Sequence, residues 1–103
     1  MARPHRRFEL LDTVLGDLPI GHCTIDQWED ARGDVQWTAR VLMARAHGTK
    51  SGRLVGRTRE GWFLAGPAMF ATDQDGPRGG RSVLVELHGT AALVQIVDPA
   101  ATA

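Results

Sequence analysis

The residues best suited to chemistry in this sequence are four histidines and a single cysteine. His47 and His88 each begin a His-Gly-Thr triplet, and two facing imidazoles could hold a metal ion or exchange a proton. Each triplet also follows an apolar run, where a glycine lets a strand end. We therefore expect no metal and no cofactor, and His47 and His88 remain only weak metal candidates. Cys23 cannot form an internal disulfide, and we expect it in the core.

Known catalytic patterns are missing from the sequence. It contains no G-x-S-x-G, no G-x-x-x-x-G-K-[ST], no H-E-x-x-H and no calcium loop. The acidic residues that could pair as acid and base lie in or beside predicted turns, where solvated carboxylates are common. These residues are Asp26, Glu29, Asp30, Asp73 and Asp75. We expect a protein that is not an enzyme.

A basic segment without acidic residues lies between Trp37 and residue 59, although the formal net charge of the chain is zero. Its candidate binding residues are Arg40, Arg53, Arg57 and Arg59. Arginines that neutralise phosphates, together with aromatic side chains that stack on bases, would suit a nucleic acid. Against this, Trp37 shares its face with apolar residues, which predicts a core position, and Arg40 falls on the opposite, outward face.

One short stretch resembles a known family. Arg3 and Arg7 have the R-x-x-x-R spacing of PilZ domains, small β-barrels that bind a cyclic dinucleotide through that motif and a later [DN]-x-S-x-x-G. The later motif is missing here, and the resemblance covers five residues. We do not assign the chain to that family.

The elements that must position these residues are predicted to be strands. Apolar and polar residues alternate over residues 35–43, the two-residue period of a half-buried strand, and a turn is expected over residues 29–34. Residues 8–18 also fit an amphipathic helix. Their counterpart, residues 52–62, contains three glycines and is a poor helix, so we interpret both as extended.

The two halves of the chain resemble each other. Gly16 and Gly61 stand at matching positions in predicted turns, and Asp-Gln, Arg-Gly and His-Gly-Thr recur in the same order, with an offset of about 45 residues at the glycines and about 41 at His-Gly-Thr. Duplication and chance convergence of turns remain alternatives. We expect an all-β fold, a small antiparallel β-barrel or sandwich of six to seven short strands. Residues 1–7 would form a basic arm, 8–97 one β domain with half-repeats 8–49 and 53–90, and 98–103 a flexible tail.

The function expected from these features is binding or assembly. A protein partner or a second copy would contact the charged turns, with Trp28 or Trp62 as anchors. The alternatives are a nucleic-acid-binding protein that uses residues 40–59, and a small-molecule or metal site, or a small enzyme, at the barrel mouth. No apolar run suits a membrane span or a secretory signal, so we expect a cytoplasmic protein.

Overall fold

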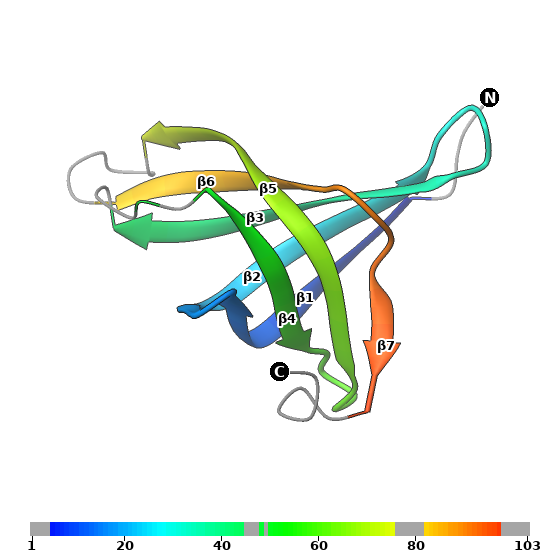
Figure 1. The fold of residues 1–103 in the computed structure, drawn as a ribbon, viewed down its shortest axis with the longest axis horizontal. Helices are drawn as coiled ribbons and strands as arrows, with labels where there is room; N and C mark the ends of the chain where they lie inside the picture. Colours follow the sequence, from blue (N-terminus) through cyan, green and yellow to red (C-terminus); the bar gives the residue numbers. More distant parts are fainter. Residues whose placement is uncertain (1–4, 45–47, 49, 76–81, 98–103) are drawn as a thin grey trace.

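The structure is a computed structural model that describes residues 5–44, 48, 50–75 and 82–97. Within those ranges it contains seven strands and no helix (Figure 1). The strands are β1 (His5–Leu15), β2 (Leu18–Glu29), β3 (Val35–Ala44), β4 (Ser51–Arg57), β5 (Phe63–Asp75), β6 (Ser82–Gly89) and β7 (Val94–Ile96). The expected all-β fold is confirmed, and residues 8–18, which also fitted a helix, form the end of β1, a turn at residues 16–17 and the first residue of β2.

The seven antiparallel strands form one sheet that closes in a ring. The order is β4-β1-β2-β3-β6-β5-β7, and an additional pairing of β4 with β5 joins the two sides (Figure 1). The first half of the chain therefore makes a meander of β1, β2 and β3, and the second half makes a meander of β4, β5 and β6. This arrangement is compatible with duplication, which remains a prediction.

Buried and partly exposed side chains alternate along β3, which gives the sheet an inner and an outer face. Trp37, Ala39 and Val41 are at most 2% exposed and face the interior, whereas Arg40 points to the outer face. The neighbouring strands repeat the pattern. Ala39 pairs with Ile25 on β2 and with Leu87 on β6, and these two partners are fully buried. Trp37 fills the centre, as its position in the sequence predicted.

Glycines make room for the Trp37 ring. The indole Nε1 of Trp37 donates a hydrogen bond to the carbonyl of Ala91 at 2.7 Å, which fixes the ring in place. A Cβ added at Gly89 would lie 2.1 Å from Trp37 Cε2, and one added at Gly66 would lie 3.1 Å from its Cζ2. The central side chain therefore depends on bare backbone at neighbouring strand positions.

The first hairpin turn of each meander contains a left-handed glycine. Gly16, between β1 and β2, has a φ of 60°, and Gly61, between β4 and β5, has a φ of 97°. Side chains other than glycine rarely adopt this conformation. The left-handed glycine predicted for each half is confirmed, but the turns do not match, because Leu15 pairs with Leu18 across a two-residue loop whereas Arg57 pairs with Phe63 across five residues.

A bulge divides β1 into two halves. Between Leu10 and Thr13 the register with β2 slips by one residue, and Asp12 has a φ of 50°. The Asp12 carboxylate accepts a hydrogen bond from Arg57 of β4 at 2.8 Å. The extra residue bends the strand, so that its second half turns toward β4 and closes the ring.

Candidate functional site

The first feature of the candidate site is a strand edge. β2 pairs with β1 from His5 to Leu15, whereas β4 pairs with β1 only from Leu11 onward. In the described part of the chain, residues 5–10 are therefore paired with a strand on one side only. Such an edge presents backbone N–H and C=O groups to which a further extended segment can add.

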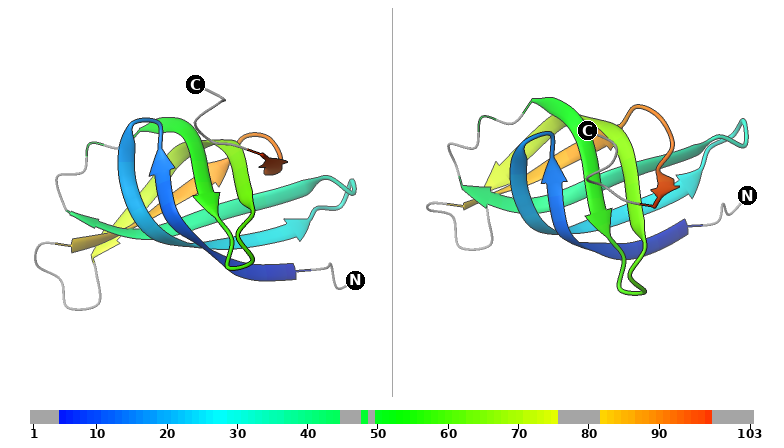
Figure 2. Two further views of the ribbon diagram at one scale, coloured as in Figure 1. Left: turned by 90° about the horizontal axis from the view of Figure 1, so that it is seen from below. Right: turned by 60° about the horizontal axis from the view of Figure 1, so that its bottom comes forward.

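The second feature is a hollow of about 1060 Å³ beside this edge. Its lining residues come from β1, β2 and β3, from the connection between β4 and β5, and from β5, β6 and the end of the chain around β7. The β4–β5 connection lies beside the first half of β1 (Figure 2), where Arg59 contacts Glu9. The residues that line the hollow include Arg6, Phe8, Gln27, Arg59, Trp62 and Leu64. The volume is at the upper end of the range for sites that enclose a ligand.

A hydrogen-bonded turn holds Trp62 at the hollow. The N–H of Thr58 donates to the carbonyl of Trp62 at 2.7 Å, and the N–H of Trp62 donates to the Thr58 hydroxyl at 3.1 Å. The side chain of Trp62 is 57% exposed, so much of its large apolar surface faces solvent. An exposed aromatic side chain on a fixed turn is well suited to anchor a partner, because little freedom is lost when it is covered.

Arg6 also lines the hollow. Its guanidinium carbon lies over the Phe8 ring, 5.5 Å from the centroid. Among the described residues Arg6 has no ion pair, in contrast to its neighbour Arg7. Stacking on the ring holds the guanidinium by its face, so its in-plane N–H groups can donate to an incoming acceptor.

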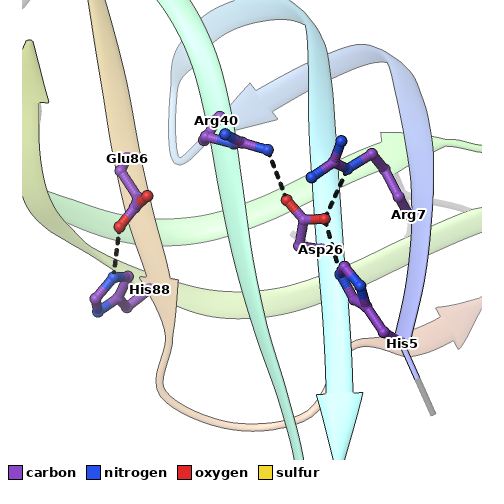
Figure 3. A network of polar contacts seen from close by, with 6 residues as sticks. All are labelled: His5, Arg7, Asp26, Arg40, Glu86 and His88. Atoms are coloured by element: carbon purple, nitrogen blue, oxygen red, sulfur yellow. Dashed lines mark hydrogen bonds and ion pairs between the residues drawn. The ribbon is translucent and has the colours of Figure 1, made fainter. Parts of the chain in front are cut away.

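The outer face of β1, β2 and β3 carries a network centred on Asp26 (Figure 3). The Asp26 carboxylate accepts hydrogen bonds from Arg7 Nε at 2.8 Å and from Arg40 at 2.9 Å, and it lies 3.0 Å from His5 Nε2. Its side chain is only 12% exposed. Burial alone would raise the pKa of this carboxyl group, but the hydrogen bonds from Arg7 and His5 outweigh it, and the pKa is lowered.

Two further carboxylates on the outer face also contact histidines. Glu9 accepts a hydrogen bond from Arg59, which lowers the pKa of Glu9, and it lies 2.9 Å from His22. Glu86 lies 2.9 Å from His88 (Figure 3). The contact of Glu9 with His22 joins β1 to β2, and its contact with Arg59 ties the β4–β5 connection to the edge of β1, whereas Glu86 and His88 both lie on β6.

The position of Asp26 corrects one expectation. The sequence analysis placed Asp26 in or beside a solvated turn, but it lies in the middle of β2 and pairs with Arg7 of β1 and Thr38 of β3. Acidic residues follow Asp26 closely in the sequence and predicted a turn there. The turn begins only at Asp30, after the end of β2. Asp26 is a structural carboxylate held between strands.

The predicted basic residues are divided between different parts of the fold. Arg40 lies on the outer face of β3 beside Asp26, and Arg57 lies beside Asp12. Arg40 and Arg59 line the hollow, whereas Arg53 and Arg57 do not. Three of the four arginines are thus bonded to carboxylates of the same chain, and Arg53 also has an interaction within the protein.

The remaining predicted residues lie apart from one another. Trp28 is half-buried on the outer face of β2, paired with Gln36, and does not line the hollow. His88 contacts Glu86, whereas His47 lies outside the described residues, so their expected proximity is not tested. In the described ranges, no group of three or more His, Cys, Asp or Glu side chains could hold a metal ion.

Cys23 is buried at 1% exposure, as expected, with its Sγ 3.9 Å from the Thr13 hydroxyl. Burial raises the pKa of the thiol to about 11. We expect iodoacetamide to alkylate folded protein at about pH 8 at least about a hundredfold more slowly than urea-unfolded protein, because the thiolate is the reacting form. Mass spectrometry over time measures both rates, and equal rates would show that the thiol is accessible and ionised.

Sequence reasoning missed Arg6, because residues 1–7 were assigned to an arm, and it did not single out Phe8 as a site residue. The signal was the alternation that runs through residues 6–10, with Phe8 and Leu10 on the inner face and Arg7 and Glu9 on the outer face. β1 begins at His5, so this alternation belongs to the sheet.

Comparison with known proteins gives no relative. No protein-family model, no curated protein and no solved structure matches the chain. No helix in the described ranges is long and apolar enough to cross a membrane.

Proposed function

We propose that this protein is a non-enzymatic binding module that captures an extended segment of a protein partner along residues 5–10 of β1. The observation that supports the proposal is the coincidence of three features: an edge paired on one side, a hollow beside it and an exposed Trp62 held at that hollow. An added strand would gain affinity from backbone hydrogen bonds, and its alternate side chains would enter the hollow.

The ion pairs of the basic residues favour a protein partner over a nucleic acid. Arg40, Arg57 and Arg59 each donate to a carboxylate of the same chain, which offsets the positive charge that a phosphate would meet. Binding of a nucleic acid through residues 40–59 would have to break these contacts. The buried, unpaired Cys23 fits a reducing compartment, and we propose that the module acts in the cytoplasm.

The proposal is tested by selecting binders from a display library of random eight-residue peptides. We expect enriched peptides to slow hydrogen exchange of the backbone amides of residues 5–10, because strand addition protects them. Exchange is read by NMR with the selected peptide in excess. Enriched peptides that leave these amides unchanged, or a library that yields no binders, would contradict the proposal, and tighter binding of an oligonucleotide would favour the nucleic-acid alternative.

Substitution of Trp62 should weaken capture. We expect Trp62→Ala to lower the affinity for a selected peptide by about tenfold or more, because truncation of an aromatic anchor costs more than about 1 kcal/mol. Met69 is 50% exposed and does not line the hollow, so Met69→Ala serves as the control and should bind normally. Calorimetric titration measures both affinities, and equal loss in the two variants would exclude Trp62 as a specific anchor.

A further inference from the structure

We infer that the captured segment carries a carboxylate, which Arg6 binds, and an apolar side chain two residues away, which packs between Phe8 and Trp62. The inference rests on the proposed function, since it specifies the chemistry of the segment that the β1 edge receives. The inference follows from the charge of Arg6 and from the residues that surround its side chain.

Arg6 differs from the other arginines around the hollow. Arg7, Arg40 and Arg59 each donate to a carboxylate of the fold, whereas Arg6 has no such partner among the described residues. Arg6 is exposed and is held over Phe8. A guanidinium in this position offers parallel N–H donors that match the two oxygens of a carboxylate.

The neighbours of Arg6 add a polar contact and an apolar wall. Gln27 pairs with Arg6 across β1 and β2 and lines the same hollow, so its side-chain amide can donate to the same carboxylate. Leu64 and Leu93 line the hollow and pack against the hydrophobic core. Alternate side chains of a strand fall on the same face, so an acidic residue and an apolar residue at positions i and i+2 can both enter.

Charge also argues against a second copy of this chain as the occupant. A second copy would have to pair with the same edge, residues 5–10 of β1. Two-fold antiparallel pairings centred on residue 6 or on residue 7 place Arg6 or Arg7 opposite the same arginine of the other copy. Like charges directly opposite each other destabilise a strand pair, whereas an acidic segment relieves the repulsion.

The inference is tested with peptides from the same eight-residue library. We expect the enriched sequences to share Asp or Glu at one position and an apolar residue two positions away. The amide form of the peptide, with Glu→Gln or Asp→Asn at that position, should bind about tenfold or more weakly than the acidic form. This comparison uses the unaltered protein, so it does not depend on the folding of a variant.

Arg6→Gln should bind both forms with equal affinity, close to that of the wild-type protein for the amide peptide. Arg32 is exposed in the β2–β3 turn and does not line the hollow, so Arg32→Gln is the matched control and should keep the preference for the acidic form. Enriched peptides without an acidic position, or an acidic preference that survives Arg6→Gln, would overturn the inference and leave capture at the β1 edge in place. A library without any binder would overturn both.

Discussion

Gly89→Ala is expected to lower the free energy of unfolding by about 3 kcal/mol or more, which is a large part of the stability of a small domain. The added Cβ would lie 2.1 Å from both Cε2 and Nε1 of Trp37. The ring cannot move aside easily, because Trp37 is 2% exposed and its Nε1 is bonded to Ala91. Urea unfolding followed by circular dichroism gives the difference from the wild-type protein.

The control for this substitution is Gly52→Ala. A Cβ at Gly52 would meet its nearest neighbour at 3.3 Å, and the φ of Gly52 lies outside the left-handed region, so we expect a loss below about 1 kcal/mol. A second control combines Trp37→Phe with Gly89→Ala. The smaller ring should relieve the clash, and the double variant should lose less stability than the sum of the single variants. A Gly89→Ala protein as stable as Gly52→Ala would refute the close packing of Trp37.

Asp26→Asn is expected to lower the free energy of unfolding by about 2 kcal/mol at neutral pH, because hydrogen bonds to a charged acceptor are stronger than those to an amide. The carboxylate is the shared acceptor of Arg7 and Arg40, and His5 contacts it as well. The control is Glu86→Gln, which removes one contact with His88 from a side chain that is 35% exposed. We expect a smaller loss there.

The effect of Asp26→Asn should depend on pH. The pKa of Asp26 is lower in the folded protein than its ordinary value, so the ionised form is favoured by folding. The resulting stability is present above the pKa of the unfolded state, about 3.9, and is lost as the pH falls through the lowered pKa of the folded state. Unfolding curves from neutral pH to about pH 2 should therefore converge for the two proteins. A constant difference would mean that charge has no part in the effect.

Local patterns were enough to predict much of the fold. The alternation around Trp37 predicted β3 and its inner face, and the left-handed turns at Gly16 and Gly61 followed from residue type. In each case the deciding physics acts between residues close in sequence, through side-chain direction or backbone sterics.

The candidate site was harder to predict because it depends on pairings between distant segments. Trp62 lies in the connection between β4 and β5. This connection comes near the first half of β1 because β4 pairs with the second half of β1. Asp26 is contacted by three side chains from two strands, His5 and Arg7 of β1 and Arg40 of β3, none of which is its neighbour in sequence. Composition and spacing carry no information on such a register, so Arg6 was assigned to an arm and Asp26 to a turn.

The bulge at Asp12 links the closure of the ring to the chemistry of its edge. Before it, the inner face holds even-numbered residues such as Leu10; after it, odd-numbered residues such as Thr13 and Leu15 are buried. Loss of one residue at this point would exchange the two faces of the preceding segment and turn Arg6 outward. The segment between Arg6 and the bulge can therefore gain or lose residues only in steps of two if Arg6 is to stay on the inner face.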